Sequence, residues 1–164
     1  MAMKAMYVAD DAGRTLRALG STVQVKATVD DTGGAFEAIV VDAQRGGDAV
    51  PHRHPWAELY LVLEGTMEVT IGARTHVAAP GDLLTIPRRA SHSFVVTSDH
   101  ARFLHLSFGP GASAMFDDYA DAVPDAPGLE DLSAIFEINE RHGIELLLPP
   151  EILELHASAV ATAG

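Results

Sequence analysis

The sequence predicts one all-β domain, a barrel or jelly roll, that ends in a short α-helical extension. Between Thr22 and Phe108, short apolar or alternating runs are separated by glycine, proline and aspartate, and helical periodicity is missing. After Gly109 the apolar residues change to helical spacing. A chain of 164 residues suits a single domain, which can bury roughly 70% of the surface that its unfolded chain exposes.

Eight short strands are predicted in the first part of the chain, a number that is typical of a closed barrel or jelly roll. They are expected at residues 22–29, 35–42, 57–63, 66–71, 74–79, 82–86, 92–97 and 101–108. Glycine-bearing turns separate many of them, so we expect residues 57–86 to form a meander. The strand at 57–63 carries apolar side chains on both faces, and its outer face therefore needs a cover.

Two helices are predicted in the extension. The first is expected in the run ASAMFDDYADA, and the second in GLEDLSAIFEINERHG, which has acidic residues in its first turn and Gly143 as its stop. We expect residues 1–110 to form the barrel with its N-terminal strands. Residues 111–164 are expected to pack on that barrel as part of the same domain.

The charge and the cysteine content exclude several functions. Eleven basic against 23 acidic residues give a net charge of −12, which disfavours nucleic acid and anionic membranes as partners. Cysteine is absent, so any metal must be bound by histidine or by carboxylates. The first residues lack an apolar run of signal-peptide length, and no stretch approaches the length of a membrane span, so we expect a cytoplasmic protein.

The residues with the clearest chemistry lie between Gly46 and Gly65. His52, His54 and Glu58 have the same parity, so an extended chain directs all three side chains to one side. A second segment, GDLLTIPRRASHSF, offers His92 as a fourth ligand after a strand-like run and a proline. Three imidazoles and one carboxylate are typical of an open metal site.

The order and spacing of these residues resemble the cupin family. The first cupin pattern, G-x5-H-x-H-x3-E-x6-G, is met at every position from Gly46 to Gly65. The second pattern, G-x5-P-x-G-x2-H-x3-N, is met at Gly81, Pro87 and His92, but Arg89 replaces the glycine and Val96 the asparagine. These departures leave the ligands intact and concern the turn before His92 and the polarity of the pocket wall. The resemblance implies a cupin jelly roll, a double-stranded β-helix.

The expected cofactor is one divalent transition metal: iron, manganese, nickel, cobalt, copper or zinc. Four protein ligands leave two positions open in an octahedral shell. The alternative is a cupin that keeps these residues but binds no metal. A buried Glu58 would then have to pair with an imidazolium or become protonated. The resemblance also implies a role for Glu58 as a catalytic base.

Strand parity suggests three further pocket residues, Tyr60, Phe94 and His105. Tyr60 shares the face of the ligands, and Phe94 shares the parity of His92, so both are candidates to line a substrate pocket. Ordinary filling of the barrel explains them equally well. His105 has apolar neighbours, which also favours a hydrogen-bonded histidine of the core.

The helical tail resembles that of small bacterial quercetin-dioxygenase-like cupins, which implies a metal-dependent dioxygenase acting on a chelating small molecule. Two alternatives remain: an isomerase, epimerase or lyase acting on a sugar-like or keto acid ligand, and a non-catalytic binding or sensing protein. The apolar outer face of strand 57–63 and the amphipathic tail predict a covered outer sheet face, either by the chain's own N-terminal strands or by a second subunit. Of these two we favour a homodimer.

Overall fold

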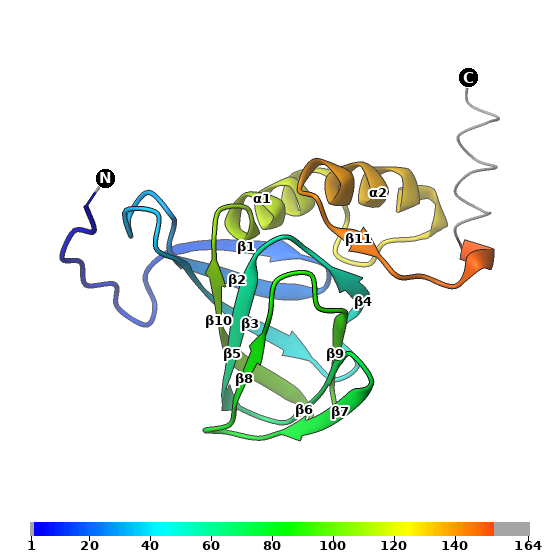
Figure 1. Ribbon diagram of the computed structural model, residues 1–164, viewed down its shortest axis with the longest axis horizontal. Helices are drawn as coiled ribbons and strands as arrows, with labels where there is room; N and C mark the ends of the chain where they lie inside the picture. Colours follow the sequence, from blue (N-terminus) through cyan, green and yellow to red (C-terminus); the bar gives the residue numbers. More distant parts are fainter. Residues whose placement is uncertain (1, 153–164) are drawn as a thin grey trace.

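The computed structural model describes residues 2–152, in which two antiparallel sheets face each other as a jelly roll (Figure 1). The six-stranded sheet has the order β1 (Arg14–Ala18), β2 (Ser21–Ala27), β3 (Glu37–Gln44), β10 (His100–Phe108), β5 (Ala57–Glu64) and β8 (Leu83–Ile86). The five-stranded sheet has the order β11 (Glu145–Leu146), β4 (Asp48–Arg53), β9 (His92–Val96), β6 (Met67–Ile71) and β7 (Arg74–Ala78). The predicted all-β class is confirmed.

The expected meander at residues 57–86 is wrong. Strand β5 pairs with β10 and β8, whereas β6 pairs with β7 and β9 in the other sheet. The chain changes sheets at Gly65, where φ is +74° and an added Cβ would lie 2.0 Å from the carbonyl oxygen of His100. Turn residues in a sequence show that the chain turns, but not which strand it then joins.

Three strands, β1, β4 and the two-residue β11, were missing from the prediction. Strand β4 is mostly exposed and contains Pro51, so it lacks the apolar alternation by which the other strands were found. It lies near the edge of its sheet, between β9 and the two-residue strand β11. The first ligand-bearing segment therefore begins on a polar strand.

The core lies between the two sheets. Side chains such as Ile39, Val62, Met67 and Phe103 are almost completely buried there. Burial of an apolar side chain of this size contributes about 1.5–3 kcal/mol. The core thus holds the inner faces of both sheets rigidly around the polar residues at one end.

The outer face of the six-stranded sheet carries a cluster of leucines. Leu61 lies opposite Leu104 and Leu83, and Leu59 lies opposite Leu106. We call these five residues the leucine face. Leu83 is 56% exposed and the other four are partly exposed, so the described chain leaves this apolar surface incompletely covered.

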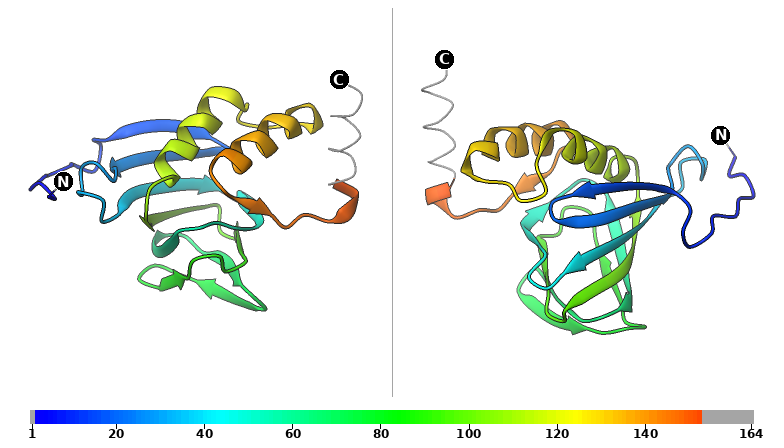
Figure 2. Two further views of the ribbon diagram at one scale, coloured as in Figure 1. Left: turned by 45° about the horizontal axis from the view of Figure 1, so that its top comes forward. Right: turned by 180° about the vertical axis from the view of Figure 1, so that it is seen from behind.

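The predicted helices are α1 (Ala112–Ala122) and α2 (Leu132–Arg141), with a short 3-10 turn η1 (Leu129–Asp131) before the second. They lie side by side across one end of the barrel (Figures 1 and 2). Buried Glu37 on β3 accepts hydrogen bonds from the backbone N–H and the hydroxyl of Ser113, at 3.1 and 2.5 Å. The first turn of α1 is thereby tied to the barrel.

The chain after α2 returns to the barrel as β11, which extends the sheet beside β4. Residues 153–164 of the predicted extension lie outside the described residues. Among residues 2–152, no helix is long and apolar enough to cross a membrane.

Candidate metal centre

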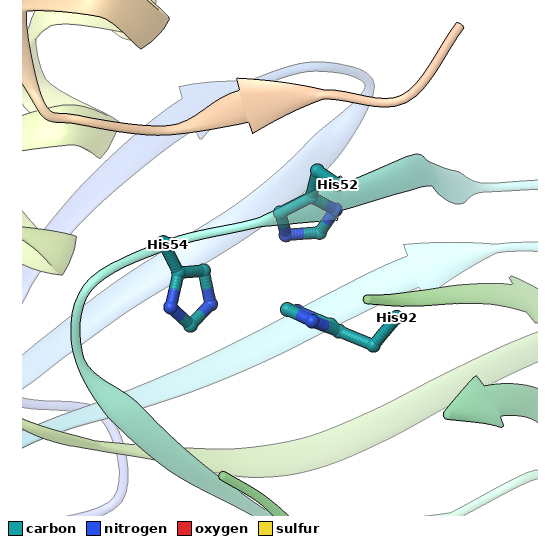
Figure 3. Close-up of side chains that lie close together, drawn as sticks. All are labelled: His52, His54 and His92. Carbon is teal, nitrogen blue, oxygen red and sulfur yellow. The ribbon is translucent and has the colours of Figure 1, made fainter. Parts of the chain in front are cut away.

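Three histidines converge at the helix-covered end of the barrel (Figure 3). His52 lies on β4 opposite His92 on β9, and His54 follows directly after β4 ends. Their ligand nitrogens all lie within 4.8 Å of one another. The structure thus brings together histidines that are 38 to 40 residues apart in the sequence.

The predicted ligands of the first segment do not share a single strand. Pro55 interrupts the extended chain because it has no N–H to donate to a sheet, and Glu58 lies on β5 in the opposite sheet. These side chains nevertheless meet, because His52 on β4, His54 just after it and Glu58 on β5 all face the same centre.

Each histidine is oriented by a backbone carbonyl. The Nδ1 atoms lie 2.8 Å from the Val50 oxygen for His52, 3.0 Å from the Trp56 oxygen for His54, and 3.0 Å from the Ala90 oxygen for His92. A carbonyl only accepts, so Nδ1 carries the proton and donates it. The Nε2 atom of each neutral ring therefore presents a lone pair, as in metal-ligating histidines.

Glu58 places its carboxylate among these nitrogens. Its Oε1 lies 2.7 Å from Nε2 of His92, and its Oε2 lies 3.3 Å from Nε2 of His54 and 2.8 Å from Nε2 of His105. These three nitrogens are buried, and their close approaches to the carboxylate lack the alignment of hydrogen bonds. Glu58 itself is 3% exposed.

This arrangement fits a metal cation. Lone pairs of Nε2 and a carboxylate repel each other when they are buried together, unless a proton or a metal ion lies between them. Nitrogen and carboxylate donors in this combination suit divalent transition metals. The residues His52, His54 and His92 can therefore hold a metal ion, with the Glu58 carboxylate beside them.

The pKa values show how the site balances its charge. Burial acts to raise the pKa of Glu58, but His105 and the other nearby imidazoles hold it well below its usual range. Burial lowers the pKa of His52 to about 4, so that ring is neutral at pH 7. For His92 burial also opposes the charge, but the Glu58 carboxylate outweighs it and raises the pKa.

The three predicted pocket residues all lie near this centre. Tyr60 is buried and donates its hydroxyl proton to Glu58 Oε1 at 2.8 Å, and burial together with Glu58 raises its pKa well above the usual value. His105 contacts the other carboxylate oxygen. Phe94 is partly buried and packs edge-on against Tyr60, with ring centroids 6.2 Å apart.

Two features of the site escaped the sequence argument. Trp56, assigned no role from the sequence, stacks on His54 with ring centroids 4.2 Å apart and planes 11° apart. Arg53, between the two histidines, forms a two-point ion pair with Glu145 of β11 at 2.7 and 2.8 Å. The contact of Trp56 could have been predicted, because the chain's single tryptophan lies two residues after His54. The ion pair of Arg53 could not, because Glu145 is 92 residues away in the sequence.

The fold and site define a small double-stranded β-helix with a buried histidine centre. Residues 39–107 match the family model of the cupin domain. No curated protein gives a significant sequence match.

Several solved structures are similar in fold. KdgF from Halomonas sp. superimposes with a TM-score of 0.61 at 18% identity, covering 68% of this chain and 99% of that one. A sugar phosphate isomerase of the cupin superfamily from Silicibacter pomeroyi gives 0.56 at 21% identity, covering 65% and 77%. The polyketide cyclase RemF from Streptomyces resistomycificus gives 0.53 at 26% identity, covering 65% and 79%. These proteins differ in function, so the shared fold leaves the reaction open.

Proposed function

We propose that His52, His54, Glu58 and His92 hold one divalent transition metal, and that the protein is a dioxygenase-like enzyme acting on a chelating small organic molecule. One observation supports the metal site above the others. Three imidazoles are oriented by backbone carbonyls so that their Nε2 lone pairs meet beside a buried carboxylate. Chelating substrates suit such a centre because four protein ligands leave two coordination positions free.

A bound metal would supply Lewis acidity and open positions for substrate oxygens and dioxygen. The protein's own groups provide the rest. Glu58 is held as an anion and is within reach to accept a proton from a bound substrate. Tyr60 and His105 hold its two oxygens, while Phe94 supplies an apolar wall.

The helices limit access to this centre, and we propose that they belong to the same domain as the barrel. Phe116 of α1 lies against His105, with ring centroids 6.4 Å apart. The Glu37–Ser113 hydrogen bonds tie α1 to β3, and the Arg53–Glu145 ion pair ties β11 to the strand that carries His52. His54, Glu58 and His92 are at most 3% exposed, and exclusion of water strengthens the electrostatic interactions among them.

The metal is tested first, by elemental analysis of protein purified without added metal. We expect about one transition metal ion per chain. Trp56 offers a second readout, because the chain's single tryptophan stacks on His54 and its fluorescence should change when metal is added.

A double variant, His52→Ala with His54→Ala, should lose the metal. The matched control is His76→Ala, which removes an exposed histidine of β7 outside the cluster and should keep full content. Full metal content in the double variant would refute the ligand assignment.

The reaction is tested by oxygen uptake on iron-, manganese- and nickel-loaded protein, with flavonols and 1,3-diketones as chelating substrates. We expect uptake with at least one pairing, and its loss in Glu58→Gln protein that still holds metal. If metal-loaded protein consumes no oxygen with any pairing, the dioxygenase proposal fails while the metal site stands.

The hydrogen-bonded group around Glu58 favours a second function, isomerase, epimerase or lyase chemistry on a sugar-like or keto acid ligand. A carboxylate in contact with a phenol and an imidazole can take up and return a proton. Exchange of substrate hydrogen for deuterium in D₂O, followed by NMR, separates this function from dioxygenation. Tight ligand binding without exchange or oxygen uptake would instead indicate a binding or sensing protein.

We also propose that the protein is a homodimer. The leucine face supports this, because a second copy would bury an apolar surface that the described chain leaves partly exposed. Light scattering at micromolar concentration should give about twice 17.4 kDa. A stable monomer would contradict the proposal.

A further inference from the structure

Four buried side-chain nitrogens in the described part of the chain have no hydrogen-bond partner, and all four lie at the metal centre or against it. Three are the Nε2 atoms of His54, His92 and His105, which face Glu58. The fourth is Nε1 of Trp56, whose ring stacks on His54. Buried polar groups are rarely left unpaired, so a cluster of unpaired groups marks a place where an ion or a ligand supplies the missing partners.

Elsewhere in residues 2–152, buried polar side chains are paired. The Glu37 carboxylate accepts two hydrogen bonds from Ser113, and the Asn139 amide donates to the Tyr119 hydroxyl. The proposed metal site accounts for the unpaired imidazole nitrogens, because each offers a lone pair. The indole N–H of Trp56 is a donor, so a metal cation cannot be its partner and it requires a separate acceptor.

The indole is held in one position. Trp56 is 4% exposed, its ring plane lies 11° from that of His54, and its carbonyl oxygen accepts the hydrogen bond from His54 Nδ1. Its six-membered ring packs against the turn before α1, where a Cβ added at Gly111 would lie 3.1 Å from Cζ3 and 3.5 Å from Cε3. These two atoms lie on the edge of the indole opposite Nε1. The turn therefore contacts the ring away from its N–H.

The chain places this donor beside the metal centre. Positions 54, 56, 58 and 60 are buried while the residues between them are partly exposed, so Trp56 is the inner-facing residue that precedes Glu58. Nε2 of His54, on which the indole stacks, lies 3.3 Å from Glu58 Oε2. The indole is thus one ring away from the atoms that we expect to hold the metal.

Charge narrows the kind of ligand that fits. Metal ligands bind in their deprotonated forms, so three neutral imidazoles, one carboxylate and a divalent metal leave one positive charge at the centre. A buried charge favours a partner of opposite sign, here a ligand with one negative charge. Enolates and carboxylates carry this charge on oxygen, which is also an acceptor for an indole N–H.

We propose that the Trp56 N–H donates a hydrogen bond to an oxygen of the small molecule that binds at the metal centre, and that this molecule is an enolate or a carboxylate. The proposal names the substrate class of the function proposed above and rests on its metal site. Trp56 is then a specificity-determining residue, because a ligand without an oxygen acceptor at this point leaves the buried N–H unpaired.

The donor is tested by NMR of zinc-loaded protein, because zinc is diamagnetic and the chain's single tryptophan gives one indole N–H signal. The probes are acetylacetone and pyruvate, which supply an enolate and a carboxylate. With at least one of them bound, we expect the indole signal to move downfield and its exchange with water to slow. The proposal is overturned if neither probe binds, or if a bound probe leaves the indole signal unchanged.

A second test removes only the N–H. Because Trp56 is the single tryptophan, it can be replaced during expression by 3-benzothienylalanine, whose ring has nearly the same shape but carries sulfur in place of the N–H. The affinity for the bound probe should fall about tenfold, while the zinc content is retained. The control is 5-fluorotryptophan, which keeps the N–H and should keep the affinity. Equal affinities of the two proteins would contradict the proposal.

Thermal unfolding of the ligand-free proteins excludes a purely structural role. The benzothienyl protein should be at least as stable as the parent, because it loses no hydrogen bond within the chain. A lower midpoint than that of the fluorotryptophan control would show that the N–H is bonded inside the folded protein, which would overturn the proposal.

The outcomes also separate the donor from the metal. Protein that holds zinc and binds a probe with an unchanged indole signal would keep the metal site and overturn the role of Trp56. A probe that shifts the indole signal equally in metal-free protein would support the donor and contradict the metal site on which the proposed function depends.

Discussion

Two segments, residues 46–65 and 81–96, carry the histidines of the site. They match the cupin sequence patterns to different degrees. The first segment matches at every position, whereas the second departs at Arg89 and Val96. Both nevertheless deliver histidines whose Nδ1 atoms bind backbone carbonyls and whose Nε2 atoms face the same centre. The site therefore depends on backbone conformation more than on the identity of these two residues.

The two departures are accommodated differently. Arg89 adopts φ of +60°, the left-handed conformation that a glycine at this position favours, and its N–H donates to the His54 carbonyl oxygen at 2.9 Å. The turn is thus retained and links the two segments directly. Val96 is 2% exposed and packs with Ala43 and Ala101. This position therefore makes apolar contacts, whereas the cupin pattern has the polar side chain of asparagine here.

The largest expected effect comes from the segment that follows its pattern. Gly65→Ala should destabilise the fold by about 4 kcal/mol or more, because φ is +74° and the new Cβ would lie 2.0 Å from the His100 carbonyl oxygen. Urea unfolding measures this cost. Gly72→Ala is the control, since φ there is +59° and nothing lies within 4 Å, and it should cost about 1 kcal/mol.

The histidines of the two segments should contribute equally to the metal site, despite the difference in pattern. His54→Ala and His92→Ala each remove one proposed Nε2 ligand and should weaken metal binding at least a hundredfold, or about 3 kcal/mol. Calorimetric titration measures the affinity, and His76→Ala should retain it. A much smaller loss for His92→Ala would show that the second segment only shapes the site.

Introducing the asparagine of the cupin pattern at position 96 should destabilise the fold. Val96→Asn buries an amide among Ala43, Ala101 and Phe94, where it lacks partners, and should cost about 2 kcal/mol in thermal or urea unfolding. The neighbouring Val95 points outward and is 36% exposed, so Val95→Asn should change stability by less than about 0.5 kcal/mol. Equal costs would mean that burial at position 96 is not the reason for the departure.

The sequence was sufficient for the fold class and for the helices, because alternation and helical spacing are local patterns. It missed β4, since an edge strand with Pro51 and polar residues has no apolar alternation. It also mispaired residues 57–86, because the change of sheet at Gly65 depends on contacts with His100, 35 residues away. Pairing between distant strands is not encoded in any short window.

The same limit applies to the candidate site. The spacing of His52, His54 and Glu58 predicted that these side chains lie together, and the structure brings them together from two sheets. The stacking of Trp56 on His54 and the contact of His105 with Glu58 arise only after the sheets close. For His105 the sequence left a core role and a pocket role open, and the structure places it 2.8 Å from the carboxylate.

The smallest expected effect tests whether Arg89 is strained. Arg89→Gly should stabilise the protein by up to about 1 kcal/mol, because glycine removes the cost of a left-handed residue but adds entropy to the unfolded chain. Arg89 is exposed, so little packing is lost. The control, Arg88→Gly, removes donors to the carbonyls of Pro55 and Phe108 at a residue whose φ is not positive, and it should destabilise. If both variants destabilised the protein equally, Arg89 would not be strained in its left-handed conformation. The turn before His92 would then tolerate arginine as well as glycine.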